Sequence, residues 1–139
     1  MYLVDTCVVS EARKQAGAHP GVKSFLRRVI HERIPVYMSV ITVGELRRGV
    51  ESIRKRGGTR QAGRLEHWLE SLLAEYPDQI LGIDADTAQL WGILQMPPSS
   101  QPLDRQIAAT ARIYDLTLVT RRTQGFVEAG VDTLNPFLE

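Results

Sequence analysis

Three carboxylates in this sequence, Asp5, Glu45 and Asp104, stand where elements of secondary structure would aim them at a common point. Asp5 ends a short apolar run, Glu45 lies within a stretch of helical periodicity, and Asp104 opens a helix of small residues. Carboxylates that converge repel one another by a few kcal/mol per pair at ~4 Å and an effective dielectric constant near 20. A hard, oxygen-seeking cation such as Mg²⁺ or Mn²⁺ removes that repulsion. The three acids together therefore predict a divalent-metal site.

Each acid also has a purely structural interpretation. Asp5 could simply cap the helix that follows it. Asp104 could stabilise the positive end of its helix dipole, an effect of roughly 0.3–1 kcal/mol, although it shares the apolar side of that helix with Ile107 and Ala111. Glu45 lies at the margin of an apolar stripe, from which a long side chain commonly reaches solvent. The combination of the three acids, rather than any one of them, favours a functional site.

The length of 139 residues predicts one domain, residues 1–139, with a single hydrophobic core. The 17 Lys and Arg residues nearly balance the 16 Asp and Glu residues, so attraction of nucleic acid would depend on a local patch. The four residues before Asp5 are too few for the apolar core of a signal peptide, and no apolar stretch is long enough to span a membrane. We therefore expect no association with a membrane. With a single cysteine, Cys7, the sequence suits a reducing cytoplasm.

Several classes of site are disfavoured by what the sequence lacks. Cys7 has no second cysteine with which to form a disulfide or a thiolate zinc cluster. An aspartyl-phosphate phosphatase would need a second acid two residues after the first, and Asp5 is followed by Thr6 and Cys7. The Gly-rich lysine signature of a P-loop is also missing, which disfavours nucleotide hydrolysis.

Short apolar runs alternate with longer helical segments, which predicts an α/β fold. The runs of strand length are Tyr2–Val4, Val36–Met38, Ile80–Ile83 and Thr117–Val119. The segments with helical periodicity are Val22–Ile30, Ile41–Ile53, Gln61–Glu75, Ala85–Leu94 and Asp104–Tyr114. Such alternation indicates right-handed crossovers between buried parallel strands, in an α/β sandwich whose ligands bind outside the carboxyl ends of the strands. The Pro-rich loop 97–102, just before Asp104, is the best candidate for a mobile segment beside a cleft.

Several motifs resemble those of a known family. They are Leu3–Glu11, Ser39–Gly49, Asp104–Ala111, Leu116–Arg121 and Leu134–Phe137. In type, order and spacing they resemble the PIN-domain ribonucleases, and among these the VapC-type toxins of bacterial toxin–antitoxin pairs, including the FitB-like branch. Each motif is short, but together they span nearly the whole chain.

This resemblance implies a three-layer α/β/α sandwich with a central, mostly parallel sheet of four to five strands. It also implies a metal-dependent endoribonuclease in which Asp5, Glu45 and Asp104 form the catalytic acidic cluster and Asp5 and Asp104 hold Mg²⁺ or Mn²⁺. Glu45 would position or deprotonate the attacking water, or bind a second ion. A cognate antitoxin that occludes the site, an RNA substrate and a homodimer are implied as partners.

The sequence departs from the family pattern at Arg122 and Gly125, where an acidic or amide ligand is usual, and at Cys7, where Asn is usual. Arg122 has three open interpretations: an ion-pair partner of the acids, a phosphate contact, or a lesion that weakens binding of a second metal ion. A guanidinium there would favour occupancy by one ion. The departures also leave open a non-catalytic PIN-like module that binds RNA or its antitoxin.

Positive charge gathers in one helix–loop–helix region, at Arg47, Arg48, Arg54, Lys55, Arg56, Arg60 and Arg64. These side chains could contact RNA phosphates, could bind an acidic antitoxin, or could form an ordinary solvated face. Contact with phosphates predicts an affinity that falls steeply with added salt.

Overall fold

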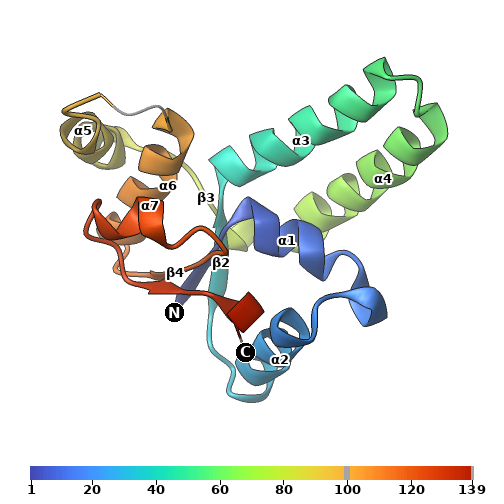
Figure 1. Cartoon of the computed structure of the whole chain (residues 1–139), viewed down its shortest axis with the longest axis horizontal. Coiled ribbons are helices and arrows are strands. Elements are labelled where there is room, and N and C mark those ends of the chain that lie inside the picture. The colour runs from blue at the N-terminus through green and yellow to red at the C-terminus, as the bar shows by residue number, and fades with distance from the viewer. Residues whose placement is uncertain (99–100, 139) are drawn as a thin grey trace.

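The computed structural model describes residues 1–98 and 101–138, and within them five strands form one parallel sheet. The strands are β1 (Tyr2–Val4), β2 (Val36–Ser39), β3 (Ile80–Leu81), β4 (Thr117–Val119) and β5 (Thr133–Leu134). Their order across the sheet is β3-β2-β1-β4-β5 (Figure 1). In this register Leu3 lies between Tyr37 of β2 and Leu118 of β4.

Helices connect the strands and cover both faces of the sheet. They are α1 (Thr6–Ala12), α2 (Pro20–His31), α3 (Val40–Lys55), α4 (Thr59–Glu75), α5 (Ala85–Leu94), α6 (Pro102–Ile113) and α7 (Gln124–Val127). Short 3₁₀ turns occupy Gln15–Gly17, Pro77–Gln79 and Pro136–Leu138. In Figure 1, α5, α6 and α7 lie on one side of the sheet, and α1, α2 and the α3–α4 pair lie on the other.

Two apolar cores form because successive residues of a strand point to opposite faces of the sheet. Leu3 and Leu118 belong to a core that also contains Ile107 of α6. Their neighbours Val4 and Val119 belong to a second core, on the face covered by α1 and α2. The predicted three-layer α/β/α sandwich with a central, mostly parallel sheet of four to five strands is therefore confirmed, and the sheet has five strands, all parallel.

The predicted strands and helices are all present, and Tyr2–Val4, Thr117–Val119 and Ala85–Leu94 have the predicted ends, whereas the ends of the others differ. The strand that begins at Ile80 ends at Leu81 rather than at Ile83, and α6 begins at Pro102, so Asp104 lies inside its first turn rather than opening it. Helix α7 and strand β5 were not predicted, because they are short and carry no run of apolar residues, and α1 was considered only as the helix that Asp5 could cap. In the Pro-rich loop 97–102, residues 99 and 100 lie outside the described residues, so the predicted mobility stays untested.

Helices α3 and α4 form an antiparallel hairpin that extends away from the sheet (Figure 1). Glu66 of α4 accepts hydrogen bonds from Arg47 at 2.5 Å and from Arg54 at 2.9 Å, both on α3. Glu51 also pairs with both arginines. Part of the positive charge that the sequence gathers here is thus neutralised between the two helices, while the proposed contact with RNA remains a prediction.

The connections between strands place β1 at a switch in the direction of winding. From β1 the chain proceeds to β2 and β3 on one side, and then continues with β4 and β5 on the other side. In sheets of this type, the crevice outside the carboxyl ends of the strands at the switch point is the usual ligand site. Asp5 follows β1 and Thr120 follows β4, so both residues lie at this crevice.

None of the helices in the described residues is sufficiently long and apolar to span a membrane.

Candidate functional site

Asp5 is fully buried where β1 ends and α1 begins, and both of its carboxylate oxygens are held. Oδ1 accepts a hydrogen bond from the backbone N–H of Thr6 at 2.8 Å, so Asp5 caps α1. Oδ2 accepts one from the buried hydroxyl of Thr120, at the end of the neighbouring strand, at 2.7 Å. These two hydrogen bonds fix the rotation of the carboxylate and point Oδ2 toward β4.

Arg122 joins Asp5 to Asp104. Its Nη1 and Nη2 donate to Oδ2 and Oδ1 of Asp104, each at 3.0 Å, in a bidentate ion pair. The same Nη2 lies 3.4 Å from Oδ2 of Asp5. The backbone N–H of Arg122 donates to Oγ1 of Thr120 at 3.1 Å, which anchors the base of the arginine beside the hydroxyl that orients Asp5. The first interpretation of Arg122, an ion-pair partner of the acids, is confirmed.

Glu45 reaches the same region through Thr6. The hydroxyl of Thr6 donates to Oε1 of Glu45 at 2.7 Å, and it lies 3.1 Å from the hydroxyl of the buried Thr42. Thr42 and Glu45 are three residues apart on α3 and therefore share a face of the helix. On the outer side of Glu45, Arg48 approaches Oε2 at 3.8 Å. One residue, Thr6, thus contacts Asp5 through its backbone and Glu45 through its side chain.

Burial and charge act in opposite directions on the groups of this site. Burial, supported by the nearby charge of Asp5, raises the pKa of Asp104 above its ordinary value, although Arg122 opposes that shift. Burial disfavours the charged form of Arg122, but the carboxylates of Asp104 and Asp5 outweigh it and raise the pKa of Arg122. Burial also raises the pKa of the Cys7 thiol, whose sulfur lies 3.8 Å from Oδ2 of Asp5. Arg122 is therefore a permanent cation between two acids.

The structure brings Asp5 and Asp104 together around one guanidinium and places Glu45 beside them, on the far side of Thr6. Within residues 1–98 and 101–138, no group of three or more His, Cys, Asp or Glu side chains could hold a metal ion in its present arrangement. The three acids thus do not meet as a preformed trio of ligands. Their catalytic assignment, and the binding of Mg²⁺ or Mn²⁺ by Asp5 and Asp104, remain predictions.

The donor chemistry at Asp5 and Asp104 nevertheless fits a hard divalent cation. Carboxylate oxygens are the ligands that Mg²⁺ and Mn²⁺ prefer, and the fully buried Asp5 needs a compensating positive charge. A single nitrogen atom, Nη2 of Arg122, is within 3.4 Å of oxygens from both residues. A small cation at a similar position could therefore contact both carboxylates.

Two threonines complete the site. The sequence leaves both helix capping and support of the acids open for the hydroxyl of Thr120, and the structure shows that it donates to Asp5 and accepts from Arg122. Thr42, three residues before Glu45, is buried against Thr6. The usable signals were the position of Thr120 after an apolar strand and the spacing of Thr42 from Glu45.

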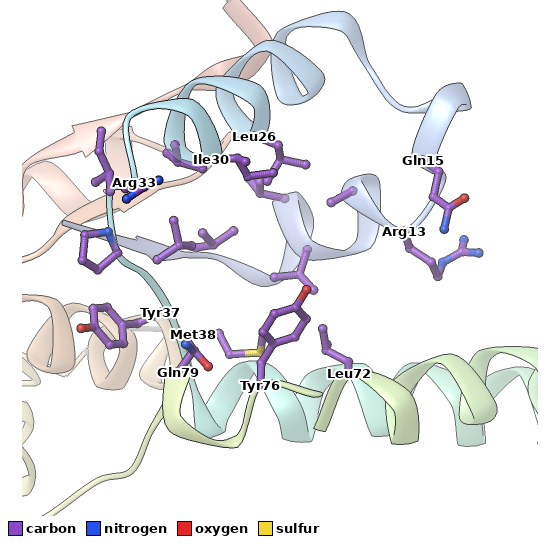
Figure 2. A pocket seen from close by; sticks show the side chains of 18 of the residues that line it. Arg13, Gln15, Leu26, Ile30, Arg33, Tyr37, Met38, Leu72, Tyr76 and Gln79 are labelled. Carbon is purple, nitrogen blue, oxygen red and sulfur yellow. The ribbon is translucent and has the colours of Figure 1, made fainter. Parts of the chain in front are cut away.

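An apolar cavity of about 520 Å³ opens on the face of the sheet covered by α1, α2 and α4. Figure 2 shows Leu26 and Ile30 from α2 on one wall and Leu72 from α4 on the opposite wall. Arg13 and Arg33 also line it. Asp5, Glu45 and Asp104 do not line it, so the cavity is distinct from the acidic site.

Comparison with known proteins identifies the family. The PIN domain family matches residues 2–129. The chain belongs to the PIN domain family. The toxin FitB of Neisseria gonorrhoeae (strain ATCC 700825 / FA 1090) is 32% identical over 142 residues, covering 99% of both chains. The VapC ribonuclease Y4jK of Sinorhizobium fredii (strain NBRC 101917 / NGR234) is 32% identical over 145 residues, and the match covers 99% of this PIN domain and 98% of Y4jK.

Solved structures agree with this assignment. The crystal structure of FitAcB from Neisseria gonorrhoeae contains a chain that is 33% identical, with a TM-score of 0.83 and coverage of 99% of both chains. The structure of FitAB bound to an IR36 DNA fragment contains one that is 30% identical, with a TM-score of 0.79 and coverage of 99% and 96%. The resemblance to VapC-type toxins, including the FitB-like branch, is therefore confirmed for this PIN domain.

Proposed function

We propose that this PIN domain is the toxin of a toxin–antitoxin pair and an endoribonuclease that hydrolyses RNA phosphodiester bonds with the help of Mg²⁺ or Mn²⁺. The observation that carries the proposal is the pairing of Asp5 and Asp104 around one positive charge at the switch point of the sheet. The relatives named a toxin and a VapC ribonuclease support the class of activity. Because RNA would be the substrate, we expect the protein to act in the cytoplasm.

In this mechanism Asp5 and Asp104 would hold the cation, and Thr120 would keep Oδ2 of Asp5 directed toward it. A divalent ion at that position would supply positive charge to the scissile phosphate and lower the pKa of the attacking water. Glu45, whose Oε1 is held by Thr6, would orient that water or accept its proton.

The test is cleavage of RNA in the presence and absence of a divalent ion. Purified protein is incubated with total RNA and single-stranded loop substrates, with Mg²⁺ or Mn²⁺ or with a chelator. We expect cleavage that the chelator abolishes, and loss of cleavage in Asp5→Asn and Asp104→Asn with an unchanged circular dichroism spectrum. Asp86→Asn, at an exposed acid in the first turn of α5, is the matched control and should cleave like the wild type. Wild-type cleavage by Asp104→Asn would refute the proposed role of the acids.

A non-catalytic PIN module that binds RNA or an antitoxin is the second candidate. It is favoured by the ion pair of Arg122 with Asp104, which occupies the space between the acids. This alternative predicts that the same assay detects RNA binding without cleavage products at any concentration of Mg²⁺ or Mn²⁺.

We further propose that the apolar cavity between α2 and α4 receives a helix of the cognate antitoxin. Ile30 at its rim is 75% exposed and Tyr76 is 42% exposed, so apolar surface is available to a partner. An amphipathic helix buries its apolar face in such a groove, and Arg13 and Arg33 would pair with acidic residues on it. Homodimer formation is likewise part of the proposal and can be measured by analytical ultracentrifugation.

A further inference from the structure

We propose that Arg122 is a built-in competitor for the cation position, so that Mg²⁺ or Mn²⁺ can bind Asp5 and Asp104 only when the guanidinium withdraws. This inference rests on the proposed function, because it concerns the regulation of the same site. It goes beyond the family assignment, because it assigns a role to a residue at which this sequence departs from the family pattern.

The contacts of Arg122 are those that a cation at this position would make. The guanidinium donates to both oxygens of Asp104 at 3.0 Å, with one hydrogen bond to each. Nη2 also approaches Oδ2 of Asp5 at 3.4 Å. A guanidinium and a divalent ion cannot contact the same oxygens from the same side, because their volumes would overlap and their positive charges would repel. Binding of the ion and the ion pair of Arg122 therefore exclude each other.

Exposure indicates which partner moves. The side chain of Arg122 is 49% exposed, whereas those of Asp5 and Asp104 are 0% and 13% exposed. Asp5 is also fixed by Thr6 and Thr120. Asp5 is thus held in place and Asp104 is mostly buried, whereas the half-exposed arginine can rotate into solvent without unfolding any element.

The backbone keeps the competitor close even when its side chain has withdrawn. The N–H of Arg122 donates to the hydroxyl of Thr120, and that hydroxyl donates to Asp5. The same threonine therefore orients the metal-binding acid and tethers the arginine that blocks it. Because the guanidinium returns from a short distance, its effective concentration is high and the apparent affinity for the ion is lowered.

The experiment measures binding of Mn²⁺ itself, by isothermal titration calorimetry and by electron paramagnetic resonance of the free ion. The wild type is compared with Arg122→Gln, which removes the guanidinium. Arg105→Gln is the matched control, because Arg105 is adjacent to Asp104 in sequence but pairs with Glu128. We expect Arg122→Gln to bind Mn²⁺ about tenfold more tightly or better, as loss of a charge-assisted bidentate pair implies, and Arg105→Gln to change the affinity less than threefold. An equal or weaker affinity in Arg122→Gln would overturn the inference.

A second measurement uses the unmodified protein. In nuclear magnetic resonance spectra, the side-chain Nε–H signal of Arg122 should move toward the position typical of a solvated arginine as Mg²⁺ is added. A signal that stays unchanged while Mg²⁺ binds would also overturn the inference.

Failure of the inference differs from failure of the proposed function. If the wild type cleaves RNA with Mn²⁺ and binds that ion as tightly as Arg122→Gln does, only the competition by Arg122 is refuted. If neither protein binds Mn²⁺ nor cleaves RNA, the proposed nuclease is refuted together with the inference.

Discussion

Asp5 combines two roles that sequence reasoning treated as alternatives. Its Oδ1 caps α1 through the N–H of Thr6, and its Oδ2 faces Thr120 and Arg122. A carboxylate has two oxygens with separate lone pairs, so capping a helix leaves one oxygen for chemistry. A structural explanation for an acid therefore does not argue against a functional one.

At the residue scale, Thr6 is predicted to position Glu45. Thr6→Val removes the hydroxyl that donates to Oε1 of Glu45 but keeps the shape of the side chain. We expect kcat for RNA cleavage to fall about tenfold, as for loss of one positioning hydrogen bond to a charged group, and Thr6→Ser to restore it. If Thr6→Val cleaves RNA at the wild-type rate, the hydroxyl of Thr6 does not position Glu45.

The protonation of Asp104 gives a prediction for stability. Burial and the charge of Asp5 raise the pKa of Asp104, so the folded state binds this proton more tightly than the unfolded chain does. Ionised Asp104 therefore lowers the free energy of unfolding above the folded pKa, and this loss vanishes below the ordinary value of 3.8. Asp104→Asn also loses the ion pair with Arg122, a loss that offsets part of this gain, so the pH dependence is the informative quantity. Without divalent ions, the Tm of Asp104→Asn relative to that of the wild type should be higher at pH 7 than at pH 3.8. A relative Tm that is unchanged or lower at pH 7 would contradict this.

At the scale of elements, the α3–α4 hairpin is held by two different kinds of contact. Leu69 of α4 is 1% exposed and packs in the core with Leu46 of α3. Glu66, one turn away, is one-third exposed and accepts hydrogen bonds from arginines of α3. Apolar burial is much the larger contribution, because ion pairs at a surface are screened by solvent.

Two substitutions on α4 separate these contributions. Leu69→Ala leaves a cavity and should lower the free energy of unfolding by about 2–5 kcal/mol. Glu66→Gln should lower it by about 1 kcal/mol or less, with a smaller effect at high salt. Urea denaturation monitored by tryptophan fluorescence measures both. A larger loss from Glu66→Gln than from Leu69→Ala would show that the ion pairs, rather than the core, hold the hairpin.

At the scale of the whole molecule, the fold presents two separate surfaces for two tasks. Asp5 lies at the carboxyl end of β1 and is joined to Asp104 by Arg122, whereas the apolar cavity lies between α2 and α4. A substitution in the cavity can therefore change the binding of a partner without changing the acids that are proposed to catalyse RNA cleavage.

This separation can be tested with one exposed residue on each of two surfaces. Ile30→Arg places a charge at the rim of the cavity, and Ile93→Arg places one at a residue of α5, 70% exposed, that does not line it. Ile30→Arg should cleave RNA normally but should bind the cognate antitoxin at least tenfold more weakly, because burial of the arginine is unfavourable. Ile93→Arg should retain wild-type binding. Calorimetry measures the affinity, and unchanged binding by Ile30→Arg would exclude the cavity as the docking surface.

The sequence by itself determined the order of strands and helices and the identity of the acids, because burial imposes periodicity and because Asp5, Glu45 and Asp104 stand at recognisable places in these patterns. It left the short elements α7 and β5 undetected and indicated α1 only as the helix that Asp5 could cap. Only the tertiary structure decided that Arg122 lies between Asp5 and Asp104, that Thr120 supports Asp5, and that Glu45 stands across Thr6. These contacts join residues 18 to 117 positions apart, and distances of that kind depend on how the strands pair and how the helices pack.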